Sequence, residues 1–381
     1  MIYFDNGATS FPKPPEVLDA YIKASGHAAN PGRSSHKMAI DSARAIFETR
    51  LAIKDFINAD STKNIIFTKN CTEALDIAIF GALSAGDHVI TTSFEHNSVL
   101  RPLHHLKNQG VELSIIDSDF DELERDIIRA IKPNTRMVAI SHVDNLVGHE
   151  KDIVSIGNSL SEDILFLVDA AQSLGHTKVD VEEARIDLLA APGHKALMGP
   201  MGTGFLYIRD ENMLTPFLVG GTGSESQSLM QPSFAPDKFE AGTLNMPGIY
   251  SLKAGIDWIN KTGLDKIEGK VKTLARYFYN RVREVEDIII YGIDNPDDIT
   301  SVVSINIEGI DCGLVAQKLD EYGEIAVRSQ LHCAPLNHMH FGTIDKGMVR
   351  FSFGYFNTQA EIDQAIEVLK RISHEAREGL I

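Results

Sequence analysis

The chain has 381 residues, enough for two domains that each bury a core of their own. Its 36 Lys and Arg against 53 Asp and Glu give a net charge of -17, which argues against nucleic acid or an anionic membrane as the main partner. No apolar run is long enough to cross a bilayer, no signal peptide is recognisable, and three cysteines do not form a disulfide framework. These features predict a cytoplasmic protein.

Strand and helix patterns alternate in the first half of the chain. We expect strands at residues 64–67, 88–92, 112–116, 136–140, 164–168, 187–190 and 204–208. Apolar residues recur with helical spacing at residues 72–83, 97–108, 122–131 and 152–160. The alternation predicts an α/β fold with a mainly parallel sheet covered on both faces. Ligands of such sheets bind at the carboxyl ends of the strands.

The second half of the chain has a different pattern. Helical spacing at 249–260 and 264–285 leads to apolar strands at 301–307 and 348–353, and a last helix covers about 359–375. We therefore expect an N-terminal arm at residues 1–15 that packs with the small domain. A large domain is expected at 16–250 and a small C-terminal α+β domain at 251–381.

Lys195 and Asp169 are the first candidates for chemistry. Lys195 lies in a turn of small residues after an expected strand, although most lysines are simply solvated. Asp169 follows the apolar run 164–168, and a buried carboxylate needs a compensating charge. A protonated pyridine nitrogen would supply that charge, and a lysine amine can form an imine. The pair therefore points to pyridoxal 5′-phosphate (PLP) held as a Schiff base on Lys195. A turn or N-cap role is the alternative for Asp169.

Two further segments would lie at the same edge of the sheet. Asn70 and Glu73 have the spacing of a capping box, and the free amides of that helix start, with the Thr72 hydroxyl, suit a phosphate. His96 follows the strand 88–92, where an imidazole could stack on a ring or move protons. Capping alone and a structural histidine are the alternatives.

Cys333 and Arg350 are candidates for contact with a substrate. Cys333 lies in a polar loop beside His332 and near Arg328, surroundings that favour a thiolate. Alternation in 348–353 places Arg350 opposite its apolar neighbours, and a guanidinium is suited to bind a carboxylate. An ordinary strand arginine is the alternative.

In chain order these motifs resemble those of the class V aminotransferase family of PLP enzymes, and they are most similar to group II cysteine desulfurases and selenocysteine lyases. The resemblance covers nearly the whole chain. The similar segments are 5–10, 30–36 (the active-site arm), 70–73, 95–96, 141–145, 169–172, 193–195, 239–243 and 328–334 (the cysteine loop).

The resemblance implies a fold-type I PLP enzyme whose large domain holds a mainly parallel seven-stranded sheet. It implies a homodimer in which Thr243 reaches the cofactor of the neighbouring subunit. The implied catalytic residues are Lys195, Cys333 and His96, and Asn145 and Arg350 would bind the substrate. The implied cofactor-binding residues are Cys71, Thr72, His96, Asn145, Asp169, Gln172, His194, Lys195 and Thr243.

The reaction implied is conversion of L-cysteine to L-alanine with a persulfide on Cys333, which would pass to a sulfur-acceptor protein; selenocysteine would react similarly. Alternatives are a transamination, epimerisation or β-lyase reaction that does not use Cys333, and a non-catalytic sulfur carrier or scaffold that keeps the fold. Gln330 stands where glycine is common, and Pro335 and residues 146–150 also depart from the family pattern. The spacing of His332, Cys333, His338 and His340 does not match a closed zinc site, so no metal is expected.

Overall fold

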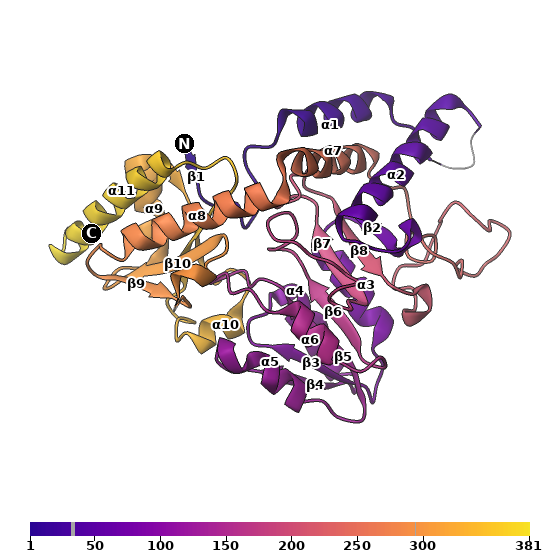
Figure 1. Cartoon of the computed structure of the whole chain (residues 1–381), viewed down its shortest axis with the longest axis horizontal. Coiled ribbons are helices and arrows are strands. Elements are labelled where there is room, and N and C mark those ends of the chain that lie inside the picture. The colour runs from indigo at the N-terminus through magenta and orange to yellow at the C-terminus, as the bar shows by residue number, and fades with distance from the viewer. Residues whose placement is uncertain (32–34, 294) are drawn as a thin grey trace.

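The structure, a computed structural model, describes residues 1–31, 35–293 and 295–381. Its centre is a seven-stranded sheet of order β2-β8-β7-β6-β5-β3-β4 (Figure 1). The strands are β2 (Ile65–Thr68), β3 (His88–Thr92), β4 (Glu112–Ile116), β5 (Thr135–Ser141), β6 (Leu165–Asp169), β7 (Leu188–Pro192) and β8 (Gly204–Ile208). β8 is antiparallel to both neighbours, and the pairs from β7 to β4 are parallel. The expected mainly parallel sheet is confirmed.

Alternate residues of the strands enter two separate hydrophobic cores, as the pleat of a strand requires. In β6, Leu165 and Leu167 pack in one core, and Phe166 and Val168 pack in the other. Helices cover both cores: α3 (Cys71–Ala82) and α4 (Asn97–Lys107) on the first, and α5 (Phe120–Arg129) and α6 (Ile153–Ser159) on the second. Because both faces are buried, the central strands form continuous apolar runs, which is why the sequence pattern located them.

Two helices near the amino terminus are absent from the predicted elements. They are α1 (Pro15–His27) and α2 (Lys37–Phe56), and both pack against α7 (Met246–Thr262) (Figure 1). Apolar side chains such as Ile22 and Phe47 are exposed on their outer surfaces. These residues blur the contrast between a buried and a solvated face on which the prediction of an amphipathic helix depends.

The C-terminal part contains a four-stranded antiparallel sheet of order β12-β13-β10-β9. Its strands are β9 (Ile288–Tyr291), β10 (Val302–Ile307), β12 (Arg328–Gln330) and β13 (Met348–Ser352). The accompanying helices are α8 (Leu264–Val282), α9 (Cys312–Gly323), α10 (Pro335–His340) and α11 (Gln359–Arg377). Short 3-10 helices lie at η1 (Thr62–Asn64), η2 (Glu211–Met213) and η3 (Pro296–Asp298).

The amino terminus lies against the C-terminal part. β1 (Ile2–Tyr3) pairs in parallel with β11 (Ile325–Ala326), and Asp5 forms a parallel bridge to Ser352. The division into an arm and two domains at residues 15 and 250 stays a prediction. Among the described residues, none of the helices combines the length and the apolar character needed to span a bilayer.

Candidate active site

A cavity of about 260 Å³ opens at the carboxyl ends of β5, β6 and β7, the edge at which a ligand is expected. The sequence-predicted site residues line this cavity together, with the exception of Thr243. They are Cys71, Thr72, His96, Asn145, Asp169, Gln172, His194, Lys195, Cys333 and Arg350. Folding therefore brings side chains from distant segments of the chain around one space.

Lys195 is reached from β7 through a tightly packed turn. A Cβ on Gly193 would lie 2.2 Å from Oγ1 of Thr203, so this turn requires glycine. Burial lowers the pKa of Lys195 from 10.5 to about 8, and the Asp169 carboxylate opposes the shift. The neutral amine is the form that attacks a carbonyl, so a usable fraction of Lys195 is reactive near neutral pH.

Side chains of the N-terminal segment hold the main chain around Lys195. Ser10 Oγ donates to the carbonyl oxygen of Lys195 at 2.7 Å. Thr9 Oγ1 and Lys13 Nζ donate to the carbonyl oxygen of His194 at 3.0 and 2.7 Å. Sequence reasoning missed these contacts, because they join segments more than 180 residues apart.

Asp169 is buried at the end of β6. Its Oδ1 accepts from the amide of Ala171 at 2.9 Å and from Cys71 Sγ at 3.4 Å. Burial raises the pKa of Cys71 well above its ordinary value, so this thiol stays protonated and can donate. Within the described part of the chain Oδ2 has no hydrogen-bond donor, so it is free to meet a cation in the cavity.

The start of α3 forms another wall of the cavity. Asn70 caps the helix by accepting from the amide of Glu73 at 2.9 Å, as expected. In a capping box the Glu73 carboxylate would accept from the amide of the N-cap residue, Asn70. Here Oε2 of Glu73 accepts instead from the amide of the preceding residue, Lys69. Cys71 and Thr72, whose amides begin the helix, line the cavity, and free amides at a helix start suit an anion.

Two histidines in the cavity are held neutral. His96 caps α4, and its Nδ1 accepts from the amide of Ser98 at 3.0 Å, which leaves Nε2 as the protonated nitrogen. Burial lowers the pKa of His96 to about 4, and burial, Lys195 and Lys13 lower that of His194 to about 4. Neutral rings of this kind can contact a flat ligand or exchange a hydrogen bond with it.

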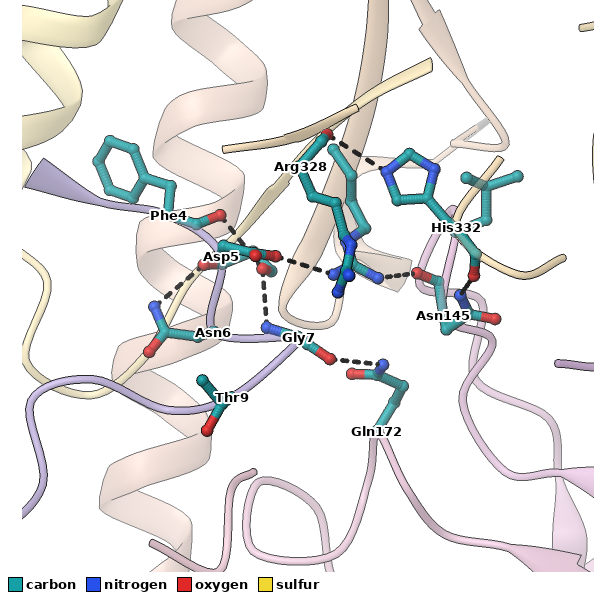
Figure 2. A network of polar contacts seen from close by, with 12 residues as sticks. Phe4, Asp5, Asn6, Gly7, Thr9, Asn145, Gln172, Arg328 and His332 are labelled. Atoms are coloured by element: carbon teal, nitrogen blue, oxygen red, sulfur yellow. Dashed lines mark hydrogen bonds and ion pairs between the residues drawn. The ribbon is translucent and has the colours of Figure 1, made fainter. Parts of the chain in front are cut away.

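Asn145 connects Arg350 to the cysteine loop. Nη1 of Arg350 donates to the carbonyl oxygen of Asn145 at 2.7 Å, and Nδ2 of Asn145 donates to the carbonyl oxygen of His332 at 2.8 Å (Figure 2). Among the described residues, Oδ1 of Asn145 and Nε of Arg350 are buried with no hydrogen-bond partner. Nε2 of Gln172 donates to the carbonyl oxygen of Gly7 at 3.1 Å (Figure 2).

Cys333 is exposed at the rim of the cavity. Its carbonyl oxygen accepts from the amide of Asn97 at 2.7 Å, next to His96. Gln330, His332 and Cys333 have φ of 81°, 50° and 57°, the left-handed region that glycine favours. The departure at Gln330 therefore falls on a position whose backbone explains the preference for glycine.

Thr243 is exposed and does not line the cavity. Its segment is anchored by Glu240, whose side chain is 7% exposed and accepts two hydrogen bonds from Arg50 Nη2 at 2.7 and 2.6 Å. The role of Thr243 in a neighbouring subunit stays a prediction. Of the expected active-site arm, residues 32–34 lie outside the described residues.

Sequence reasoning assigned no role to several residues that line the cavity, namely Gly7, Ala8, Ser98 and Ser141. Their only signal was position within or next to a recognised motif. Across the described ranges, no group of three His, Cys, Asp or Glu is placed to hold a metal ion. His338 Nδ1 instead contacts Thr343 Oγ1 at 2.8 Å, and His340 Nδ1 contacts Asp117 Oδ1 at 2.8 Å.

Comparison with known proteins places this site in context. The family model described as aminotransferase class V matches residues 2–365. A probable cysteine desulfurase of Pyrococcus abyssi is 39% identical, with 98% of this chain and 94% of the relative covered. A solved apo cysteine desulfurase of Thermococcus onnurineus NA1 has a TM-score of 0.92 and 35% identity, covering 98% of this chain and 94% of that one. The cysteine desulfurase CsdA of Escherichia coli has a TM-score of 0.86 and 25% identity, covering 100% and 95%.

These comparisons confirm the family and the fold class expected from the motifs. The match extends over nearly the whole chain, and the relatives are likewise covered nearly completely. Fold-type I architecture, with a large and mostly parallel sheet, is shared with the solved cysteine desulfurases. The chain belongs to the aminotransferase class V family.

Proposed function

We propose that this chain is a PLP-dependent cysteine desulfurase that converts L-cysteine to L-alanine and leaves the sulfur as a persulfide on Cys333. The reaction is the one named for relatives at 33 and 39% identity and for the solved structures of the same fold. Selenocysteine would react in the same way. One observation carries the proposal: Cys333 lines the same cavity as Lys195, Asp169 and Arg350.

The polar groups of the cavity fit PLP. The free Oδ2 of Asp169 suits a protonated pyridine nitrogen, and the amides that begin α3 suit a phosphate. His194 Nδ1 is buried without a partner among the described atoms and can take up a further polar contact. Lys195 would hold the cofactor covalently, and His96 and Gln172 would contact its ring. Bound PLP supplies an electron sink for the substrate Cα.

The chain's own residues account for the remaining chemistry. Arg350 and Asn145 would bind the substrate carboxylate and fix its orientation. The Lys195 amine would move a proton at Cα. The Cys333 thiolate would then attack the substrate sulfur: a sulfur–sulfur bond forms, the bond between sulfur and Cβ breaks, and its electron pair stays on Cβ. Protonation of Cβ gives alanine, and the sulfur stays on Cys333 as a persulfide.

The position of Cys333 favours this reaction over one that does not use a thiol. Two hydrogen bonds hold the cysteine loop to the site. The amide of Asn97 donates to the carbonyl oxygen of Cys333, and Nδ2 of Asn145 donates to the carbonyl oxygen of His332. Exposure of Cys333 leaves a persulfide accessible to a sulfur-acceptor protein. We infer a cytoplasmic location from the three free cysteines.

We also infer a homodimer. Leu229 and Met230 are 103% and 78% exposed in the same connecting region that carries Thr243, between β8 and α7. Exposed apolar side chains that adjoin one another, unlike single scattered ones, are typical of a surface that a partner covers. A second copy would bring Thr243 toward a neighbouring cavity, as the resemblance implies.

The test is incubation of the PLP-loaded protein with L-cysteine, with alanine and sulfide measured separately. Cys333→Ala is expected to lower both by roughly 100-fold or more, since it removes the nucleophile. Cys312→Ala is the matched control, because Cys312 is buried in α9 and does not line the cavity. If Cys333→Ala releases alanine at the parent rate, the reaction does not use Cys333 and another class V reaction must be considered.

A further inference from the structure

Arg350 already has an acidic partner within the protein. Its Nη2 donates to Oδ1 of Asp5 at 3.1 Å, although the residues are 345 positions apart (Figure 2). The side chains are 3% and 20% exposed. A buried guanidinium without a counter-charge is costly, so Asp5 compensates Arg350 before any substrate arrives.

Asp5 is fixed in this place by its backbone. It bridges Ser352, which lies two residues beyond Arg350 in β13, and the amide of Gly7 donates to Ser352 Oγ at 2.8 Å. The amide of Ala8 donates to the carbonyl oxygen of Asp5 at 3.0 Å. A Cβ on Gly7 would come within 3.1 Å of Nη2 of Arg350, so the segment lies directly on the guanidinium.

No other carboxylate of the described residues pairs with Arg350. Asp144 is near, but its Oδ1 accepts from the amides of Leu146 and Val147 at 2.7 and 2.9 Å. Nε of Arg350 has no partner among the described residues, and Nη1 and Nη2 each donate one hydrogen bond within the protein, so the guanidinium has further N–H groups for a ligand. An amino acid carboxylate that binds there must share the guanidinium with Asp5, and the two anions repel each other.

We propose that Asp5 is a positioning residue that weakens the binding of amino acid carboxylates to Arg350. It keeps the guanidinium compensated and in place in the free site, and it competes with the carboxylate of substrate and product. Product release is easier as a result, because the repulsion acts on alanine as it does on cysteine. The inference rests on the proposed function, which assigns Arg350 to the carboxylate.

The test compares the binding of L-alanine and L-alaninamide to the PLP-loaded, full-length protein by calorimetry. Asp5→Asn keeps an oxygen that can accept from Arg350 but removes the charge. It is expected to lower the Kd of L-alanine roughly tenfold, the effect of one nearby charge in a partly solvated site. The Kd of L-alaninamide, which has no carboxylate, is expected to stay unchanged. Asp19→Asn is the matched control on the exposed side of α1.

Kinetics separate this role from a merely structural one. With L-cysteine, Asp5→Asn is expected to lower KM, whereas a misfolded site would raise KM and reduce kcat together. Unchanged or weaker binding of L-alanine by a variant that melts at the parent temperature would overturn the proposal. If Asp5→Asn does not fold, Asp5→Ser removes the same charge and carries the same expectation.

The two proposals can fail separately. A parent protein that binds L-alanine but releases no sulfide from L-cysteine refutes the desulfurase reaction and leaves the role of Asp5 standing. A protein that releases sulfide normally, but whose Asp5→Asn variant binds L-alanine as the parent does, refutes the role of Asp5 alone.

Discussion

Lys151 and Glu95 form a buried ion pair next to the candidate site, with side-chain exposures of 2% and 0%. Oε2 of Glu95 accepts from the amide of Ser141 at 2.6 Å, and Nζ of Lys151 donates to Ser141 Oγ at 2.9 Å. Ser141 lines the cavity and Glu95 precedes His96, so the pair supports two walls of the site. Lys151→Met keeps most of the length of the side chain and removes its charge.

The expected cost follows from the geometry. Nζ and Oε1 are 3.7 Å apart, which corresponds to roughly 4 kcal/mol at an effective dielectric constant of about 20. Removing one partner of a buried pair typically costs about 3–5 kcal/mol, because the other charge is left unpaired. At about 2–4 °C per kcal/mol, we expect the melting temperature of Lys151→Met to fall by about 10 °C.

The assay is thermal unfolding followed by circular dichroism, with Lys178→Met as the matched control. Lys178 is 67% exposed and pairs with Glu183 at 2.9 Å, so its loss should leave the melting temperature close to that of the parent. Adding Glu95→Gln to Lys151→Met should restore most of the stability, since neither charge of this pair then remains. If Lys151→Met melts no lower than Lys178→Met, the argument from the buried pair is wrong.

The loss in Lys151→Met should also depend on pH. Burial raises the pKa of Glu95, so the folded carboxyl binds its proton more tightly than the unfolded one does. The contribution of this group to stability therefore decreases as pH rises from the ordinary value of 4.5 through the raised one. The difference in melting temperature between Lys151→Met and the parent is therefore expected to become smaller in acid.

Two further predictions concern the lysine turn. The rate at which the PLP-free chain captures PLP, followed by absorbance, should rise with pH around a midpoint of about 8, because burial lowers the pKa of Lys195. Lys195→Ala should capture no PLP. A midpoint near 10.5, the ordinary pKa of lysine, would contradict the reasoning. Gly193→Ala should lower stability by roughly 1–3 kcal/mol and weaken PLP retention, because its Cβ would lie 2.2 Å from Thr203 Oγ1. Gly26→Ala in α1 has open space around its Cβ and should not destabilise, so equal melting of the two alanine variants would speak against the packing argument.

Sequence pattern was most informative where burial is one-sided or complete. The apolar run of β6 and the Asp169 that ends it are a local signal, since a fully buried strand leaves little room for polar residues. The cap at Asn70 is equally local, because it joins residues three apart. The helices α1 and α2 escaped prediction because apolar side chains occur on both of their faces.

Much of the site could likewise be named in advance. Asp169 ends β6, and Lys195 and His96 follow closely after β7 and β3, so the parallel sheet brings these three side chains to one edge. Arg350 comes instead from β13 of the antiparallel C-terminal sheet. Assigning them to one cofactor depended on the resemblance, because each motif alone has a common structural explanation. Thr243 remains a prediction, since its partner would belong to another subunit.

The sequence by itself determined the parallel sheet, the edge at which the site lies and the chemical character of most residues there. Only the tertiary structure decided which charges meet: Asp5 with Arg350, and Lys151 with Glu95. The physical reason is range. Periodicity and capping act between residues a few positions apart, whereas an ion pair depends on where two remote segments are packed, and a single sequence carries no local signal of that distance.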